Sequence, residues 1–196
     1  EVDCERIRRN TVAVVQLCAA YGIQVVGVTK ACCGHPDVAR AMLAGGVSLL
    51  AESRLRNVHR LRDAGLDDEI MFLRLPALSE AEEVVRLTQI SLNSQLETVH
   101  ALSHAARTQG CIHQVVLMIE TGDRREGVMP ERALEVAREI VRLPNIELAG
   151  VGANMGCIAG ALPTQENTQR LINVAEEIEA ALGFRLRLIS AGNSAS

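Results

Sequence analysis

Residues 115–151 hold two apolar runs on either side of a helical pattern, and this stretch decides the fold class. The runs read Val-Val-Leu-Met-Ile at 115–119 and Ile-Glu-Leu-Ala-Gly-Val at 146–151. Between them, Pro130 stands where a first helical residue is favoured, and residues 132–143 place apolar side chains at helical spacing. A continuously apolar run is typical of a strand buried on both faces of a parallel sheet. The stretch therefore predicts a strand, a crossover helix and a second, parallel strand.

The same alternation extends along the whole chain. A second helical pattern covers residues 171–182, Pro36 is placed to begin another helix, and Ser79 with Glu82 forms a capping-box pattern. Regular alternation of strands and helices indicates an α/β fold with a parallel sheet, either an open doubly wound sheet or a closed eight-stranded barrel. The seven candidate strands cover residues 23–28, 47–50, 70–75, 90–92, 115–119, 146–151 and 186–189.

The length favours a truncated barrel over a complete one. A TIM-type (β/α)8 barrel takes about 250 residues, whereas the chain has 196. We therefore expect about seven βα units of such a barrel. No linker or low-complexity stretch divides residues 1–196, which we interpret as one incomplete barrel domain.

The composition excludes several classes of partner. The formal charge is −4 and aromatic residues make up 2% of the chain, so both a basic surface and stacking platforms for nucleic acid are missing. No run reaches the roughly 18 consecutive apolar residues of a membrane span. The six cysteines show neither a C-x-x-C pair nor zinc-ligand spacing, which favours reduced thiols in the cytoplasm. We expect no nucleic-acid partner, no membrane partner and no metal.

Lys30 is the only lysine among the 20 basic residues. An arginine can replace a lysine that supplies only surface charge, but it stays protonated and cannot act as a nucleophile or form an imine. A surface lysine with no special role remains an alternative. The position of Lys30 directly after the first candidate strand favours a chemical role, because the active sites of α/β barrels lie at the carboxyl ends of the strands.

Other polar residues also follow the candidate strands. Arg125 lies after the fifth strand, Asn154 after the sixth and Ser190 after the seventh. The turn Ala-Gly-Asn-Ser-Ala-Ser at 191–196 contains Asn193 and Ser194 and could hold a phosphate through backbone N–H and hydroxyl groups, although such a turn is also ordinary loop chemistry. A lysine and a phosphate-binding turn at strand ends point to pyridoxal 5′-phosphate held as a Schiff base.

Three separated motifs carry a family resemblance. Val-Thr-Lys-Ala at 28–31, Thr-Gly-Asp-Arg-Arg-Glu-Gly at 121–127 and Ser-Ala-Gly-Asn-Ser at 190–194 resemble, in this order, the N-terminal barrel domain of the alanine racemase family. The resemblance is closer to its ornithine-racemase-like branch of amino-acid racemases. It implies a pyridoxal-phosphate-dependent isomerase that removes and returns the α-proton of an amino acid bound as an external aldimine.

The resemblance also implies a role for each candidate residue. Lys30 would bind the cofactor covalently and serve as the base on one face of the substrate α-carbon. Arg125 would approach the phenolic oxygen of the cofactor, and Asn154 would lie near the ring, where alanine racemases carry a histidine. Ser190, Asn193 and Ser194 would hold the ring and the phosphate.

Two departures from the alanine racemases leave alternatives open. Residues 31–35 lack the tyrosine that alanine racemases place against the phosphate, which counts against alanine as the substrate. The eighth strand and the C-terminal β domain expected of the family lie beyond residue 196, together with the second base, which a partner subunit supplies in a homodimer. A non-catalytic pyridoxal-phosphate-binding barrel, or a lyase on the same fold, therefore remains an alternative to the racemase.

Overall fold

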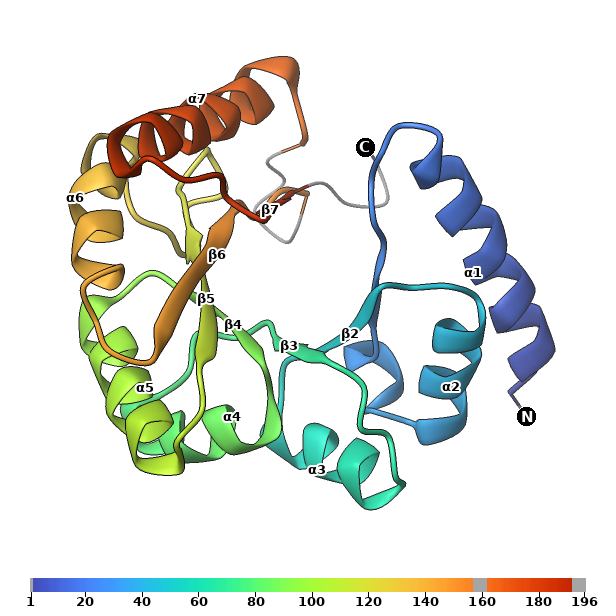
Figure 1. The fold of residues 1–196 in the computed structure, drawn as a ribbon. Coiled ribbons are helices and arrows are strands. Elements are labelled where there is room, and N and C mark those ends of the chain that lie inside the picture. The colour runs from blue at the N-terminus through green and yellow to red at the C-terminus, as the bar shows by residue number, and fades with distance from the viewer. Residues whose placement is uncertain (1, 157–161, 192–196) are drawn as a thin grey trace. The chain divides into compact units, whose positions relative to one another are not determined.

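The computed structural model describes residues 2–156 and 162–191, and these form two compact units. The first unit comprises residues 1–74 and 86–90, and the second comprises residues 75–85 and 91–196. Seven strands alternate with seven α-helices along the described residues, as the sequence predicts (Figure 1).

The first unit is built from three parallel strands and three helices. Strand β1 (Val26–Val28) pairs with β2 (Leu49–Glu52), which pairs with β3 (Ile70–Phe72). Helices α2 (Pro36–Ala44) and α3 (Leu55–Asp63) connect these strands, and α1 (Cys4–Ala19) packs against α2 (Figure 1). Val58 and Leu61 of α3 are fully buried, as are Leu50 and Ile70 of the strands.

Arg62, in the last turn of α3, links the end of this helix by hydrogen bonds to residues 66–68 and 87–89. Its guanidinium donates to the carbonyl oxygens of Leu66 at 2.7 Å, Asp68 at 2.8 Å and Leu87 at 2.7 Å, and to the Gln89 side chain at 3.2 Å. A guanidinium carries five N–H donors in a planar fork, which suits such a set of acceptors. Partial burial lowers the pKa of Arg62 from its usual range.

The second unit contains the longest strands. Strand β5 (His113–Met118) pairs in parallel with β6 (Ile146–Gly152), which pairs with β7 (Leu188–Ser190). Helices α5 (Leu96–Gln109), α6 (Pro130–Ile140) and α7 (Gln165–Leu182) cover one side of β5 and β6 (Figure 1). The turn η2 (Leu78–Glu80) also belongs to the second unit, whereas the turn η1 (Lys30–Cys32) belongs to the first, and α4 (Ala81–Leu87) and β4 (Ile90–Asn93) have residues in both.

Aliphatic side chains fill the core of the second unit. The fully buried side chains include Val115 and Leu117 of β5, Ile140 of α6 and Leu171 of α7. Each such side chain stabilises the fold by about 1.5–3 kcal/mol. The near-continuous burial of β5 and β6 confirms the sequence interpretation of strands covered on both faces.

The predicted capping box at Ser79 and Glu82 is wrong. Ser79 lies inside η2, and α4 begins only at Ala81. The carboxylate that caps this turn belongs to Glu80, which accepts from the backbone N–H of Ala77 at 3.0 Å. A short 3-10 turn before the α-helix moves the capping position two residues toward the N-terminus.

Glu179 joins the end of α7 to the segment before β7. Its carboxylate accepts from the backbone N–H of Leu186 at 2.9 Å and from the Arg185 guanidinium at 2.6 Å. The backbone hydrogen bond is the main reason why the pKa of Glu179 is lowered, and Arg185 adds to the effect. This junction determines where β7 enters the sheet beside β6.

Candidate functional site

Lys30 follows β1 directly, at the carboxyl end of the strand. Thr29 continues the strand by donating its backbone N–H to Ala51 at 3.0 Å, and the chain then turns into η1, which Lys30 begins. The Lys30 side chain is exposed, and within the described residues its amine forms no hydrogen bond or ion pair. The position therefore presents a primary amine to solvent on a rigid strand end.

A buried hydrogen-bond network fixes the residue before the lysine. The Thr29 hydroxyl donates to Glu52 Oε2 at 3.0 Å, and both residues are fully buried. The other carboxylate oxygen of Glu52 accepts from the backbone N–H of Ser53 at 2.6 Å. Because a carboxylate is costly to bury unless it is hydrogen-bonded, this network favours one conformation at the ends of β1 and β2.

Replacement of Glu52 is expected to destabilise the ends of β1 and β2. Glu52→Leu removes the acceptor for Thr29 and Ser53 and is expected to lower the free energy of unfolding by about 2 kcal/mol. Glu52→Gln keeps the shape and one acceptor, so a loss of about 1 kcal/mol is expected. Chemical denaturation of both variants measures the difference. Equal stability of Glu52→Leu and the wild type would contradict a structural role for the network.

The loop after Lys30 folds back onto the same strand end. Gly34 donates its backbone N–H to the Thr29 carbonyl at 3.1 Å, and Arg60 of α3 donates to the Cys33 carbonyl at 2.7 Å. Gly34 has φ +64°, and a Cβ at this position would lie 2.8 Å from the backbone oxygen of Asn57. Glycine is therefore required for this close approach, which fixes the backbone after Lys30.

In the second unit, residues 120–127 form a loop that is closed at its base. Glu120 donates its N–H to Val128 at 2.9 Å, and Val128 donates to Met118 at 2.8 Å. Gly127 has φ +146°, and a Cβ there would lie 2.6 Å from the backbone nitrogen of Glu120. The resulting loop projects from the carboxyl end of β5.

Arg125 and Asn154 are in direct contact in this unit. Arg125 Nη2 donates to Asn154 Oδ1 at 2.7 Å and to Glu126 Oε1 at 3.1 Å. Asn154 Nδ2 donates to the same Glu126 oxygen at 2.9 Å. Three side chains thus form a closed ring of hydrogen bonds that orients the guanidinium at the strand ends.

Ser190 ends β7 beside β6, the strand that Asn154 follows. Its backbone carbonyl accepts from Ala153 N–H at 2.9 Å, so the segments that carry Ser190 and Asn154 are neighbours. The other two predicted phosphate-binding residues, Asn193 and Ser194, lie outside the described residues. Of the candidate residues in the second unit, the structure brings together Arg125, Asn154 and the backbone of Ser190.

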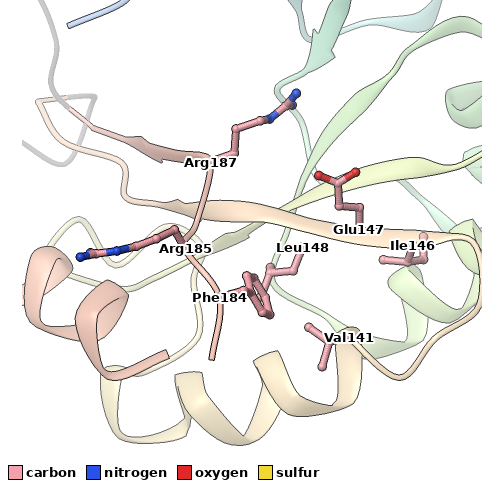
Figure 2. Close-up of a pocket in the computed structure, with 7 residues that line it drawn as sticks. All are labelled: Val141, Ile146, Glu147, Leu148, Phe184, Arg185 and Arg187. Atoms are coloured by element: carbon pink, nitrogen blue, oxygen red, sulfur yellow. The ribbon is translucent and has the colours of Figure 1, made fainter. Parts of the chain in front are cut away.

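A pocket of about 250 Å³ lies at the opposite end of these strands. Figure 2 shows Phe184, Leu148, Val141 and Ile146 grouped around it, while the Arg185 and Arg187 side chains point in different directions. Ile146 is the first residue of β6, and Phe184 precedes β7. The amino-terminal end of a barrel contributes to stability, whereas its chemistry lies at the carboxyl end. We therefore do not assign the candidate site to this pocket.

The fold and the strand-end residues define the chain as an α/β domain of the TIM-type (β/α)8 barrel class, with seven βα units present. The chain belongs to the alanine racemase N-terminal domain family, whose sequence profile it matches over residues 2–196. This confirms the family resemblance and the fold class expected from the sequence.

Two relatives and one solved structure describe this similarity. The chain is 36% identical to an ornithine racemase of Acetoanaerobium sticklandii over 196 residues, which cover all of the chain and 55% of that protein. It is 34% identical to a lysine racemase of Thermotoga maritima, across 98% of the chain and 54% of that protein. An alanine racemase structure from Clostridium difficile 630 superposes with a TM-score of 0.79 at 22% identity, over 99% of this chain and 51% of that one. The chain spans about half the length of these relatives.

Two residues of the site had no predicted role. Thr29 and Glu126 lie next to Lys30 and Arg125 in the quoted motifs, but their hydrogen bonds reach residues 23 and 28 positions further along the chain. Adjacency to a candidate residue within a motif was the only available signal.

No described helix is long and apolar enough to cross a membrane, and the described residues contain no group of three or more potential metal ligands.

Proposed function

We propose that the protein is a pyridoxal-phosphate-dependent amino-acid racemase in which Lys30 binds the cofactor. The observation that carries the proposal is the position of Lys30: the only lysine of the chain, exposed at the carboxyl end of β1 and fixed by buried Thr29 and Glu52. Membership of the alanine racemase N-terminal domain family supports the activity class. The names of the ornithine and lysine racemases make diamino acids the first substrates to test.

The residues present fit the cofactor by the chemistry of their donor groups. A primary amine at Lys30 can condense with an aldehyde, and the oriented guanidinium of Arg125 can donate to an oxyanion. Ser190 offers a hydroxyl at the end of β7, and Asn193 and Ser194 are proposed to add phosphate contacts. Bound pyridoxal phosphate acidifies the α-proton of an amino acid by delocalising the negative charge left on the α-carbon.

Lys30 would then move the α-proton on one face of the substrate through Nζ. A lysine amine serves as a base only when it is deprotonated, and a side chain held at a strand end can be positioned for such a transfer. Asn154 and Glu126 would hold Arg125 in place through the ring of hydrogen bonds. Racemisation needs a second proton donor on the opposite face, which we expect from residues outside this chain.

Removing the Asn154 side chain is expected to weaken the site without unfolding the domain. Asn154→Ala deletes one acceptor for Arg125 and is expected to lower kcat/KM about 10-fold, the effect of one lost hydrogen bond to a charged group. Asn173→Ala, on the exposed face of α7, serves as the matched control and is expected to match the wild type. Racemase assays of the two variants measure this difference. Equal kcat/KM of Asn154→Ala and the wild type would contradict a role of Asn154 in the site.

A racemisation assay separates the proposed function from its alternatives. The full-length protein is incubated with single enantiomers of ornithine, lysine, serine and alanine, and chiral chromatography follows the appearance of the other enantiomer. Conversion of at least one of them supports the racemase. Cofactor binding without conversion of any substrate favours the cofactor-binding barrel, and formation of cleavage products favours a lyase.

A further inference from the structure

The loop that carries Arg125 contains two buried polar side chains without partners. Asp123 is 3% exposed, and neither of its carboxylate oxygens has a hydrogen-bond partner among the described residues. Thr121 is 5% exposed, and its hydroxyl oxygen is also without one. Burial of a carboxylate without a donor or a counter-charge is among the costliest arrangements in a protein. Such a group is retained where something outside the loop completes it.

One donor of the loop close to Asp123 is already engaged. The backbone N–H of Gly122, between the two residues, is already taken by the carboxylate of Glu120. The hydrogen bonds between Glu120, Val128 and Met118 fix the two ends of the loop and leave residues 121–127 between them. The Asp123 carboxylate therefore has two acceptor oxygens in a folded loop and no donor for either among the described residues.

The missing donor has the chemistry of an ammonium group. Two carboxylate oxygens and one hydroxyl oxygen within three residues offer three acceptors, and an ammonium carries three N–H donors and a positive charge. In the described residues, Asp123 belongs to no group of three or more potential metal ligands. An organic cation therefore suits the acceptors better than a metal ion.

The position of the loop indicates which molecule carries this ammonium. Asp123 is two residues from Arg125, in the loop that follows β5 at the end of the barrel where substrates bind. We propose that Asp123, assisted by Thr121, binds the side-chain ammonium of a diamino-acid substrate and so determines substrate specificity. This inference rests on the proposed racemase function and adds to it the residue that selects a diamino acid.

A pair of substrates with and without the ammonium tests the proposal. Lysine and norleucine share a six-carbon chain, but norleucine lacks the second amino group. The full-length wild type is expected to favour lysine by at least about 100-fold in kcat/KM, because a site built to bind a polar group rejects the analogue that lacks it. Asp123→Asn is expected to lower kcat/KM for lysine about 100-fold and to change the value for norleucine less than threefold. Asp67→Asn, an exposed loop acid, is the matched control and is expected to leave both values unchanged.

Thermal unfolding distinguishes substrate binding from a structural role of Asp123, because loss of a structural residue would lower the melting temperature. Because Asp123→Asn removes a carboxyl group that is buried without a hydrogen-bond partner among the described residues, the melting temperature without amino acid is expected to rise. Added lysine is expected to raise the melting temperature of the wild type and not that of the variant. A lower melting temperature of Asp123→Asn, or an equal loss of activity toward lysine and norleucine, would overturn the proposal.

Binding measurements keep this test separate from the racemase proposal. Calorimetric titration of lysine and norleucine into the wild type and Asp123→Asn reports affinity whether or not racemisation occurs. An Asp123-dependent preference for lysine without turnover would support the binding role and count against the racemase. Racemisation of neutral amino acids without such a preference would support the racemase and overturn the role of Asp123.

Discussion

Replacement of Lys30 with alanine is expected to lower racemisation by at least about 1,000-fold, because the same amine both binds the cofactor and transfers a proton. The lysine amine lies in an exposed position after β1 and forms no hydrogen bond or ion pair with the described residues. Its removal is therefore expected to change the free energy of unfolding by less than about 0.5 kcal/mol, as for other surface substitutions. Racemase assays and denaturation of the full-length variant measure both quantities.

Lys30→Arg is the control that separates charge from chemistry. Arginine keeps the positive charge but cannot form an imine or lose its proton at neutral pH. We expect it to be as inactive as Lys30→Ala. Substantial racemisation by Lys30→Arg would show that the position supplies only charge and would contradict the role of the amine.

Gly150→Ala is expected to lower the free energy of unfolding by about 3 kcal/mol or more. Gly150 pairs with Leu188 in the sheet, and a Cβ at this position would overlap the Leu188 backbone carbonyl. A backbone obstacle cannot rotate away as a side chain can, so β6 and β7 would have to separate, beyond the cost of ordinary overpacking. Chemical denaturation of the variant measures the loss.

Gly152→Ala, two residues further along the same strand, is the matched control. Its added Cβ would lie 3.0 Å from the flexible Met118 side chain and 3.2 Å from the Ser190 backbone oxygen. A small shift relieves these contacts, and a cost of about 1 kcal/mol is expected. An equal cost at both positions would contradict the close approach of β6 and β7 at Gly150.

The strand order could be predicted because the apolar runs are regular. Each of the seven predicted runs overlaps an observed strand, and Pro36 and Pro130 begin helices as expected. The boundaries differ where pairing decides them. The predicted first strand begins at residue 23, but pairing with β2 begins only at Val26, and Ile23 is 57% exposed. Register between strands is a tertiary property that a single run of residues does not contain.

Helix α1 was absent from the sequence predictions. It spans Cys4–Ala19 and contains no fully buried residue. Asp3 begins it as an N-cap by accepting from the Arg6 N–H at 2.9 Å. Besides this capping signal, half-buried side chains recur at helical spacing at Ile7, Thr11, Val15 and Cys18, a pattern that the sequence predictions left unused.

The candidate site could be predicted to the level of strand ends. The rule that chemistry gathers at the carboxyl ends identified Arg125 and Asn154, and the structure joins them by a hydrogen bond. The rule could not identify Glu52 as the partner of Thr29, because that bond depends on the pairing of β1 with β2. Nor could it show that Asp123 is buried without a hydrogen-bond partner among the described residues, since burial depends on how the loop folds.

The most direct test of the central claim locates the cofactor on the chain. The full-length protein, purified with pyridoxal phosphate, is reduced with borohydride, digested and analysed by mass spectrometry. We expect a pyridoxyl-phosphate adduct on the peptide that contains Lys30, and its loss in Lys30→Ala. No adduct on the wild-type peptide, or an adduct that persists in Lys30→Ala, would contradict the assignment of Lys30 as the cofactor-binding residue.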